Sequence, residues 1–87
     1  MSYQFVFEPE AIADLDEMDA TTRQRIFHKI NWLALNFEQA VPQGLSANLA
    51  GFYKLRVGDY RVIYTFNQPE QLISIVRAGH RREVYNF

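Results

Sequence analysis

Tyr53-Lys54-Leu55-Arg56-Val57-Gly58-Asp59-Tyr60-Arg61-Val62-Ile63-Tyr64 is the stretch of sequence that decides the fold. Two runs rich in β-branched and aromatic residues flank Gly58 and Asp59, a pattern typical of a β-hairpin with a two-residue loop. Glycine at the first loop position can adopt the positive φ that such a turn requires. The loop also predicts the register, with Val57 opposite Tyr60 and Arg56 opposite Arg61.

This register sorts the hairpin into two faces, because successive side chains of a strand point to opposite sides of the sheet. The apolar face holds Tyr53, Leu55, Val57, Tyr60, Val62 and Tyr64. The other face holds Phe52, Lys54, Arg56, Arg61, Ile63 and Thr65. Like charges directly across a hairpin repel, so Arg56 opposite Arg61 does not favour folding, whereas a bound phosphate would relieve the repulsion. The alternative is that the two arginines extend into water or pair with carboxylates such as Asp59 or Glu83.

The residues before the hairpin predict one strand and two helices. Aromatic residues at every second position over residues 3–8 indicate a strand with one buried face, and Pro9 ends it and suits the first turn of a helix. A second helix begins at a cap at Asp19 or Thr21, its apolar positions recur at helical spacing up to Phe37, and residues 42–44 predict a turn. We expect the two helices to form a hairpin.

After the hairpin, residues 72–78 predict another strand. The loop that precedes it is four or five residues long, and the two lengths place Arg77 on opposite faces of the sheet. The expected fold is α+β, with a two-helix hairpin packed on one face of a small, mainly antiparallel β-sheet in the order β-α-α-β-β-β, with an optional short last strand. Residues 1–87 are expected to form a single domain.

Composition limits the classes of protein that the chain can represent. It has 87 residues, 48% of them hydrophobic, and no cysteine, which excludes disulfide scaffolds, Cys-based zinc sites and thiol nucleophiles. No apolar run approaches the roughly 18 residues of a membrane span, and no secretory signal is visible, so we expect a cytoplasmic protein that contacts no membrane. The net charge of −1 combines an acidic first part, residues 1–50, with a basic second part, residues 51–87.

A second group of polar residues follows the last predicted strand, in Gly79-His80-Arg81-Arg82-Glu83-Val84-Tyr85. Arginines near a scissile phosphate stabilise the extra negative charge of a pentacoordinate phosphorane, and RNA supplies its own nucleophile in the 2′-OH. Phe52 and Tyr85 are aromatic residues that could stack on an unpaired base. The sequence has no HExxH or P-loop motif, so we expect no metal and no cofactor. His28 has no partner constellation and is expected to have no role.

The run Leu49–Tyr64 together with Gly79–Tyr85 resembles the RelE/ParE toxin superfamily, and specifically its RelE-type mRNA interferase branch, over nearly the whole chain in element order. The resemblance implies a toxin of a type II toxin–antitoxin system, a ribosome-dependent endoribonuclease that cleaves mRNA in the A site by metal-free 2′-OH attack and so inhibits translation. It also implies neutralisation by a cognate RelB-like antitoxin, with operator DNA contacted only through that complex.

By position, the resemblance implies a role for each cationic or aromatic candidate. Arg61 would stabilise the phosphorane, Arg81 would assist the leaving group, and Lys54 and Arg56 would hold phosphates. Tyr85 would stack on the substrate or orient the 2′-OH, and His80 is a candidate general acid or base. Because arginine is no base at neutral pH, proton abstraction is left to Lys54, His80 or Tyr85.

Two rival functions share this fold. One is a ParE-like protein that inhibits DNA gyrase by binding and cuts no RNA. The other is a degenerate toxin that only binds antitoxin and, through it, operator DNA. Lys54, Arg81 and Tyr85 favour the ribonuclease.

Overall fold

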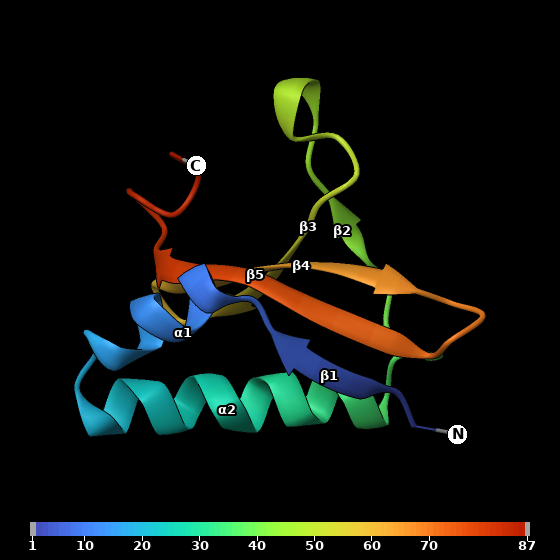
Figure 1. Cartoon of the computed structure of the whole chain (residues 1–87), viewed down its shortest axis with the longest axis horizontal. Coiled ribbons are helices and arrows are strands. Elements are labelled where there is room, and N and C mark those ends of the chain that lie inside the picture. The colour runs from blue at the N-terminus through green and yellow to red at the C-terminus, as the bar shows by residue number, and fades with distance from the viewer. Residues whose placement is uncertain (1, 87) are drawn as a thin grey trace.

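The computed structural model describes residues 2–86 and has two layers, a twisted sheet and a helical layer under one of its faces (Figure 1). Along the chain the elements are β1 (Gln4–Phe7), α1 (Pro9–Asp16), α2 (Ala20–Leu35), β2 (Gln43–Gly44), the 3-10 turn η1 (Ala47–Leu49), β3 (Tyr53–Val57), β4 (Tyr60–Asn67) and β5 (Leu72–His80). The five strands lie in the order β1-β5-β4-β3-β2. β1 runs parallel to β5, and every other pairing is antiparallel. The predicted α+β architecture is confirmed.

The hairpin β3–β4 has the predicted register. Val57 pairs with Tyr60 and Arg56 with Arg61, and Gly58 has a φ of 59°. Leu55, Val57, Val62 and Tyr64 are buried in the core, and Tyr53 and Tyr60 pack against it. We call the helix-covered side of the sheet the inner face and the opposite side the open face.

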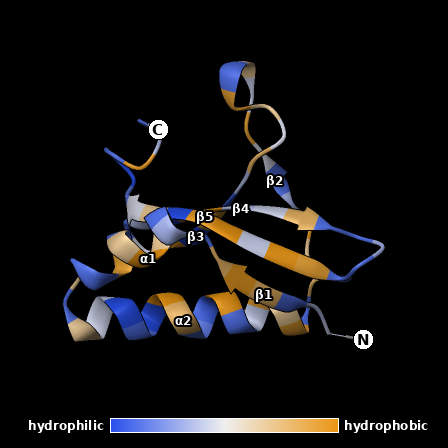
Figure 2. Ribbon diagram, viewed as in Figure 1, coloured by the Kyte–Doolittle hydropathy of each residue, from blue (hydrophilic) through white to orange (hydrophobic). Residues whose placement is uncertain are grey.

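The core lies between the inner face and one stripe of α2. The predicted helical positions Ile26, Ile30 and Leu33 are all buried, as is Ala34. Figure 2 shows hydrophobic residues along β1 and β5, and hydrophobic residues alternating with hydrophilic ones along α2. Phe37 lies beyond the end of α2 and is still buried, with its ring centroid 4.4 Å from that of Tyr3. This core holds the hairpin rigidly from below.

A β-bulge decides the facing of Arg77, which the sequence left open. The register between β4 and β5 shifts at Ile63/Tyr64, so that Arg77 stands opposite Ile63. Its guanidinium forms a bidentate ion pair with Asp14 of α1, with Nε–Oδ2 at 2.8 Å and Nη2–Oδ1 at 3.1 Å. The hydrogen bond to Asp14 raises the pKa of Arg77 further. Arg77 therefore fastens α1 to β5.

One local prediction is wrong. Residues 43–44 were expected in a turn but form β2, in which Gln43 pairs with Lys54 and Gly44 with Tyr53. In place of the optional short last strand, residues 81–85 form a turn after β5, which continues to His80. The N–H groups of Glu83 and Val84 donate to the carbonyl of His80 at 2.9 and 3.0 Å, which closes this C-terminal turn.

Candidate functional site

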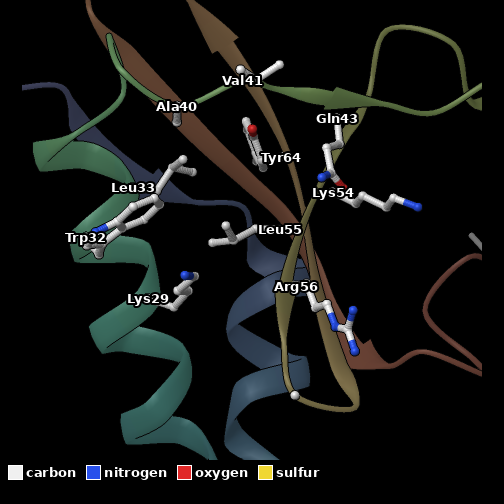
Figure 3. A pocket seen from close by; sticks show the side chains of 11 residues that line it. Lys29, Trp32, Leu33, Ala40, Val41, Gln43, Lys54, Leu55, Arg56 and Tyr64 are labelled. Atoms are coloured by element: carbon white, nitrogen blue, oxygen red, sulfur yellow. The ribbon is translucent and has the colours of Figure 1, made fainter.

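Three cationic residues lie on the open face of the hairpin, as the alternation predicts. Arg56 is exposed, and Lys54 and Arg61 are half-buried. Figure 3 shows Lys54 and Arg56 leaving β3 on the side away from α2, whereas Leu55 points toward the helix. Arg56 and Arg61 are direct cross-strand partners. Two like charges are therefore held close together on this face.

The hairpin loop brings Arg61 and Arg81 to the same place. Nη1 of Arg61 donates to the carbonyls of Gly58 and Tyr60, each at 2.8 Å. The backbone N–H of Arg81 donates to the carbonyl of Asp59 at 2.9 Å, and its Nε lies 4.0 Å from an Asp59 carboxylate oxygen. That ion pair is weak, because both side chains are more than half exposed. The loop thus orients Arg61 through one nitrogen and leaves Nε and Nη2 of its fork directed elsewhere.

The C-terminal turn packs back onto the open face through Val84. Val84 is 5% exposed, and a Cβ atom placed on Gly79 would lie 3.5 Å from the Val84 Cβ. Gly79 pairs with Arg61, so this contact lies beside the cations. Tyr85 follows Val84 directly and is half-buried. Val84 therefore anchors the C-terminal turn on which Tyr85 lies.

His80 does not join this cluster. It is the cross-strand partner of Tyr60, an inner-face residue, and the two ring centroids are 5.6 Å apart. Its Nδ1 accepts a hydrogen bond from the backbone N–H of Arg82 at 3.3 Å. Asp14 and Glu17 of α1 line the same hollow of about 230 Å³ as His80. Sheet alternation thus places His80 on the side of the helices, away from Lys54, Arg56 and Arg61.

Phe52 lies at the opposite end of the open face. It is half-buried and lines a hollow of about 500 Å³ together with Thr65, Val76 and Arg77, and with Glu8 and Glu10. Two carboxylates at its margin make this hollow a poor site for phosphate. Phe52 therefore adds an apolar surface beyond Lys54 rather than a continuation of the phosphate-binding surface.

One group of surface residues was missed by the sequence analysis. Arg25, Lys29 and Trp32 of α2 form a row facing the free edge of β3, and Lys29 Nζ lies 4.2 Å from the centroid of the Trp32 ring. Their spacing of four and then three residues is the signal that would have found the row. His28, which was expected to have no role, is exposed beside it.

Residues 2–86 contain no group of three or more His, Asp or Glu side chains that could hold a metal ion. No helix among them is long and apolar enough to cross a membrane.

Comparison with known proteins defines the class. The sequence model described as the ParE toxin of the type II toxin–antitoxin system parDE matches residues 5–85. The chain therefore belongs to this family and is a type II toxin of the RelE/ParE superfamily. No curated protein sequence matches it.

Solved structures of the superfamily share the fold. The chain is similar to one in the toxin–antitoxin complex RelBE2 from Mycobacterium tuberculosis, with 24% identity over 93% of this chain and 100% of that chain, and a TM-score of 0.83. It is also similar to one in the archaeal RelE–RelB complex from Pyrococcus horikoshii, with 21% identity over 97% and 100% and a TM-score of 0.71. A YoeB/ParE toxin from Agrobacterium tumefaciens matches with 21% identity over 90% and 98% and a TM-score of 0.66.

Proposed function

We propose that this toxin is a ribosome-dependent endoribonuclease that cleaves mRNA in the A site by metal-free 2′-OH attack, in one domain spanning residues 1–87. The observation that carries the proposal is the set of cations on the open face, where Lys54, Arg56 and Arg61 lie together and Arg81 meets the hairpin loop. This arrangement does not stabilise the fold, but it favours the binding of a polyanion. The proposal places the protein in the cytoplasm, where ribosomes are.

Each cation has a role in the proposed reaction. The 2′-OH attacks the adjacent phosphorus, and negative charge grows on the non-bridging oxygens of the phosphorane. Arg61 donates to those oxygens through Nε and Nη2, because Nη1 is already engaged with the loop carbonyls. Lys54 and Arg56 hold the flanking phosphates. Arg81 stabilises the leaving 5′-oxygen, and Phe52 and Tyr85 stack on unpaired bases.

Fewer side chains are suited to proton transfer than the sequence analysis suggested. His80 faces the helices, which argues against its role as the general acid or base. Arginine remains protonated at neutral pH, so Arg56 is no base. Lys54 or Tyr85 therefore takes the proton from the 2′-OH, and the P–O5′ bond breaks as the bond from the 2′-oxygen to phosphorus forms. Solvent water gives a proton to the leaving 5′-oxygen, and the arginines lower the free energy of the charged transition state.

The proposed partners are a RelB-like antitoxin, the ribosome and mRNA, with operator DNA contacted only through the antitoxin complex. The support is that similar chains from M. tuberculosis and P. horikoshii have been solved in toxin–antitoxin complexes. A second candidate function is inhibition of DNA gyrase by binding, without RNA cleavage. The match to the ParE toxin model favours it.

Primer extension on a defined mRNA, with and without translating ribosomes, tests the proposal. We expect wild-type cuts that require ribosomes. Substitution Arg61→Ala should reduce them by about a hundredfold or more, because it removes a preorganised donor to the phosphorane. Tyr85→Ala should reduce them by a smaller factor, and Thr22→Ala, distant on α2, is the control. Circular dichroism checks that each variant folds. If the wild type arrests growth but cuts no RNA and instead blocks gyrase supercoiling, the second function is correct.

A further inference from the structure

A groove runs between α2 and the edge strand β3. Two adjoining hollows of about 450 Å³ each share Lys29, Trp32, Arg56 and Gly58 in their lining. Neither hollow is lined by an acidic residue. Four cationic residues contribute to the lining, namely Arg25, Lys29, Lys54 and Arg56. The whole chain carries a net charge of −1, so this concentration of positive charge is local. An occupant of the groove must be acidic.

The floor and rim of the groove are apolar. Leu33 and Leu55 line it from below, Trp32 is 45% exposed and Val41 is 84% exposed. Figure 3 shows Leu33 and Leu55 pointing into the space between α2 and β3. A base could stack on Trp32, but the aliphatic side chains of Leu33, Val41 and Leu55 are covered best by the aliphatic side chains of a protein. We therefore take the occupant to be a protein segment.

The edge of β3 offers backbone groups to such a segment. Val57 and Tyr60 flank the two-residue loop and exchange both backbone hydrogen bonds, so the N–H and C=O of Arg56 point away from β4. β2 pairs only with Tyr53 and Lys54 and stops before Arg56. Within residues 2–86 the backbone of Arg56 has no hydrogen-bond partner across this edge. A strand added here would extend the sheet.

We propose that an extended segment with alternating apolar and acidic side chains docks as a short strand on β3 at Arg56. Alternation follows from the geometry, because one set of its side chains faces Leu55, Leu33 and Trp32 and the other set faces Lys54 and Arg56. This inference rests on the proposed function in one respect, which is that the segment belongs to the antitoxin. Docking there occupies two of the cations that hold RNA, so the antitoxin and the substrate compete for Lys54 and Arg56.

A binding experiment on the intact wild-type chain tests this without any cleavage assay. The probe is a capped octapeptide of four Val-Glu repeats, and the signal is fluorescence of Trp32, the one tryptophan of the chain. We expect a saturable change that weakens with added salt, together with slower hydrogen exchange at the Arg56 amide. A peptide of the same composition, with four valines followed by four glutamates, should bind at least about tenfold more weakly. Alternating Val-Lys should not bind.

Variants separate the groove from general charge attraction. Arg56→Glu and Lys54→Glu should each weaken binding of the Val-Glu peptide by about tenfold or more. Arg82→Glu, a charge reversal of an exposed arginine in the C-terminal turn, should weaken it by less than about twofold. Equal binding of the two Val and Glu peptides, an unprotected Arg56 amide, or no saturation up to about 1 mM would overturn the proposal. So would an oligouridine that changes Trp32 fluorescence more strongly than the peptide.

The outcomes also distinguish this inference from the proposed function. If the peptide binds and ribosomes show no cuts, the groove stands and the ribonuclease proposal fails. If the mRNA is cut and the peptide does not bind, the ribonuclease proposal stands and the groove proposal fails.

Discussion

The two faces of the hairpin β3–β4 are made by alternate residues of the same two strands, and they obey different rules. On the inner face, Val62 and Tyr64 are 0% and 1% exposed and complete the core against α2. On the open face, Arg56 stands directly opposite Arg61, where like charges repel. The inner face therefore lowers the free energy of the folded state, and the Arg56–Arg61 pair raises it. A pair of side chains that opposes folding is the place to look for function.

The largest expected effect on stability comes from removing a large side chain from the inner face. Tyr64→Ala should lower the free energy of unfolding by about 3–5 kcal/mol, because the cavity left among Phe37, Tyr53 and Phe66 cannot fully collapse. That is a large part of the total stability expected for a domain of this size, about 5–10 kcal/mol. Urea denaturation measures it.

Thr65→Ala is the matched control, one position along β4 and on the open face. It should change the free energy of unfolding by no more than about 0.5 kcal/mol. Similar losses in the two variants would show that the faces do not differ as described.

The loss of stability at alkaline pH tests whether the inner face excludes water. Burial, with a smaller contribution from Tyr53, raises the pKa of Tyr64 from 10.0 to about 12. The folded state then favours the neutral phenol, so this stabilisation is complete below pH 10 and is lost as the pH rises toward 12. Between about pH 9 and pH 12 the wild type should lose about 2–3 kcal/mol more than Tyr64→Phe does. Parallel pH profiles from urea denaturation would contradict a dry site for this hydroxyl.

The smallest expected effect is on the open face, and its sign is opposite. Arg56→Thr removes one of two opposed charges and introduces a residue that favours strands, so the free energy of unfolding should rise by a few tenths of a kcal/mol, and by at most about 1 kcal/mol. The gain should shrink in high salt, because salt screens the repulsion. A loss of stability at low salt would mean that the stem of Arg56 contributes packing that outweighs the repulsion.

The register of the hairpin and the membership of its faces could be predicted from the sequence because they follow from a two-residue loop and strict alternation. The facing of Arg77 could not, because a single bulged residue in β5 changes it and no local pattern marks the bulge. The parallel pairing of β1 with β5 and the short strand β2 are set by tertiary contacts rather than by local propensity.

In the candidate site, too, features set by local pattern could be predicted and features set by tertiary contacts could not. Lys54, Arg56 and Arg61 were placed together by the register, which the structure confirms. His80 was grouped with Arg81 by nearness in sequence, but the last residue of β5 shares its face with Tyr60, and the chain turns immediately after it. The row on α2 was missed because its significance depends on the edge of β3 lying opposite, which is a tertiary fact.

The rate at which Arg56→Thr cleaves mRNA on translating ribosomes tests the central claim most directly. The variant should fold at least as stably as the wild type, so a lower rate reports on the RNA rather than on unfolding. A hydrogen bond to a charged group contributes about 1.5–3 kcal/mol, so the account predicts cleavage that is roughly tenfold to a hundredfold slower. A stable Arg56→Thr variant that cuts at the wild-type rate would contradict it.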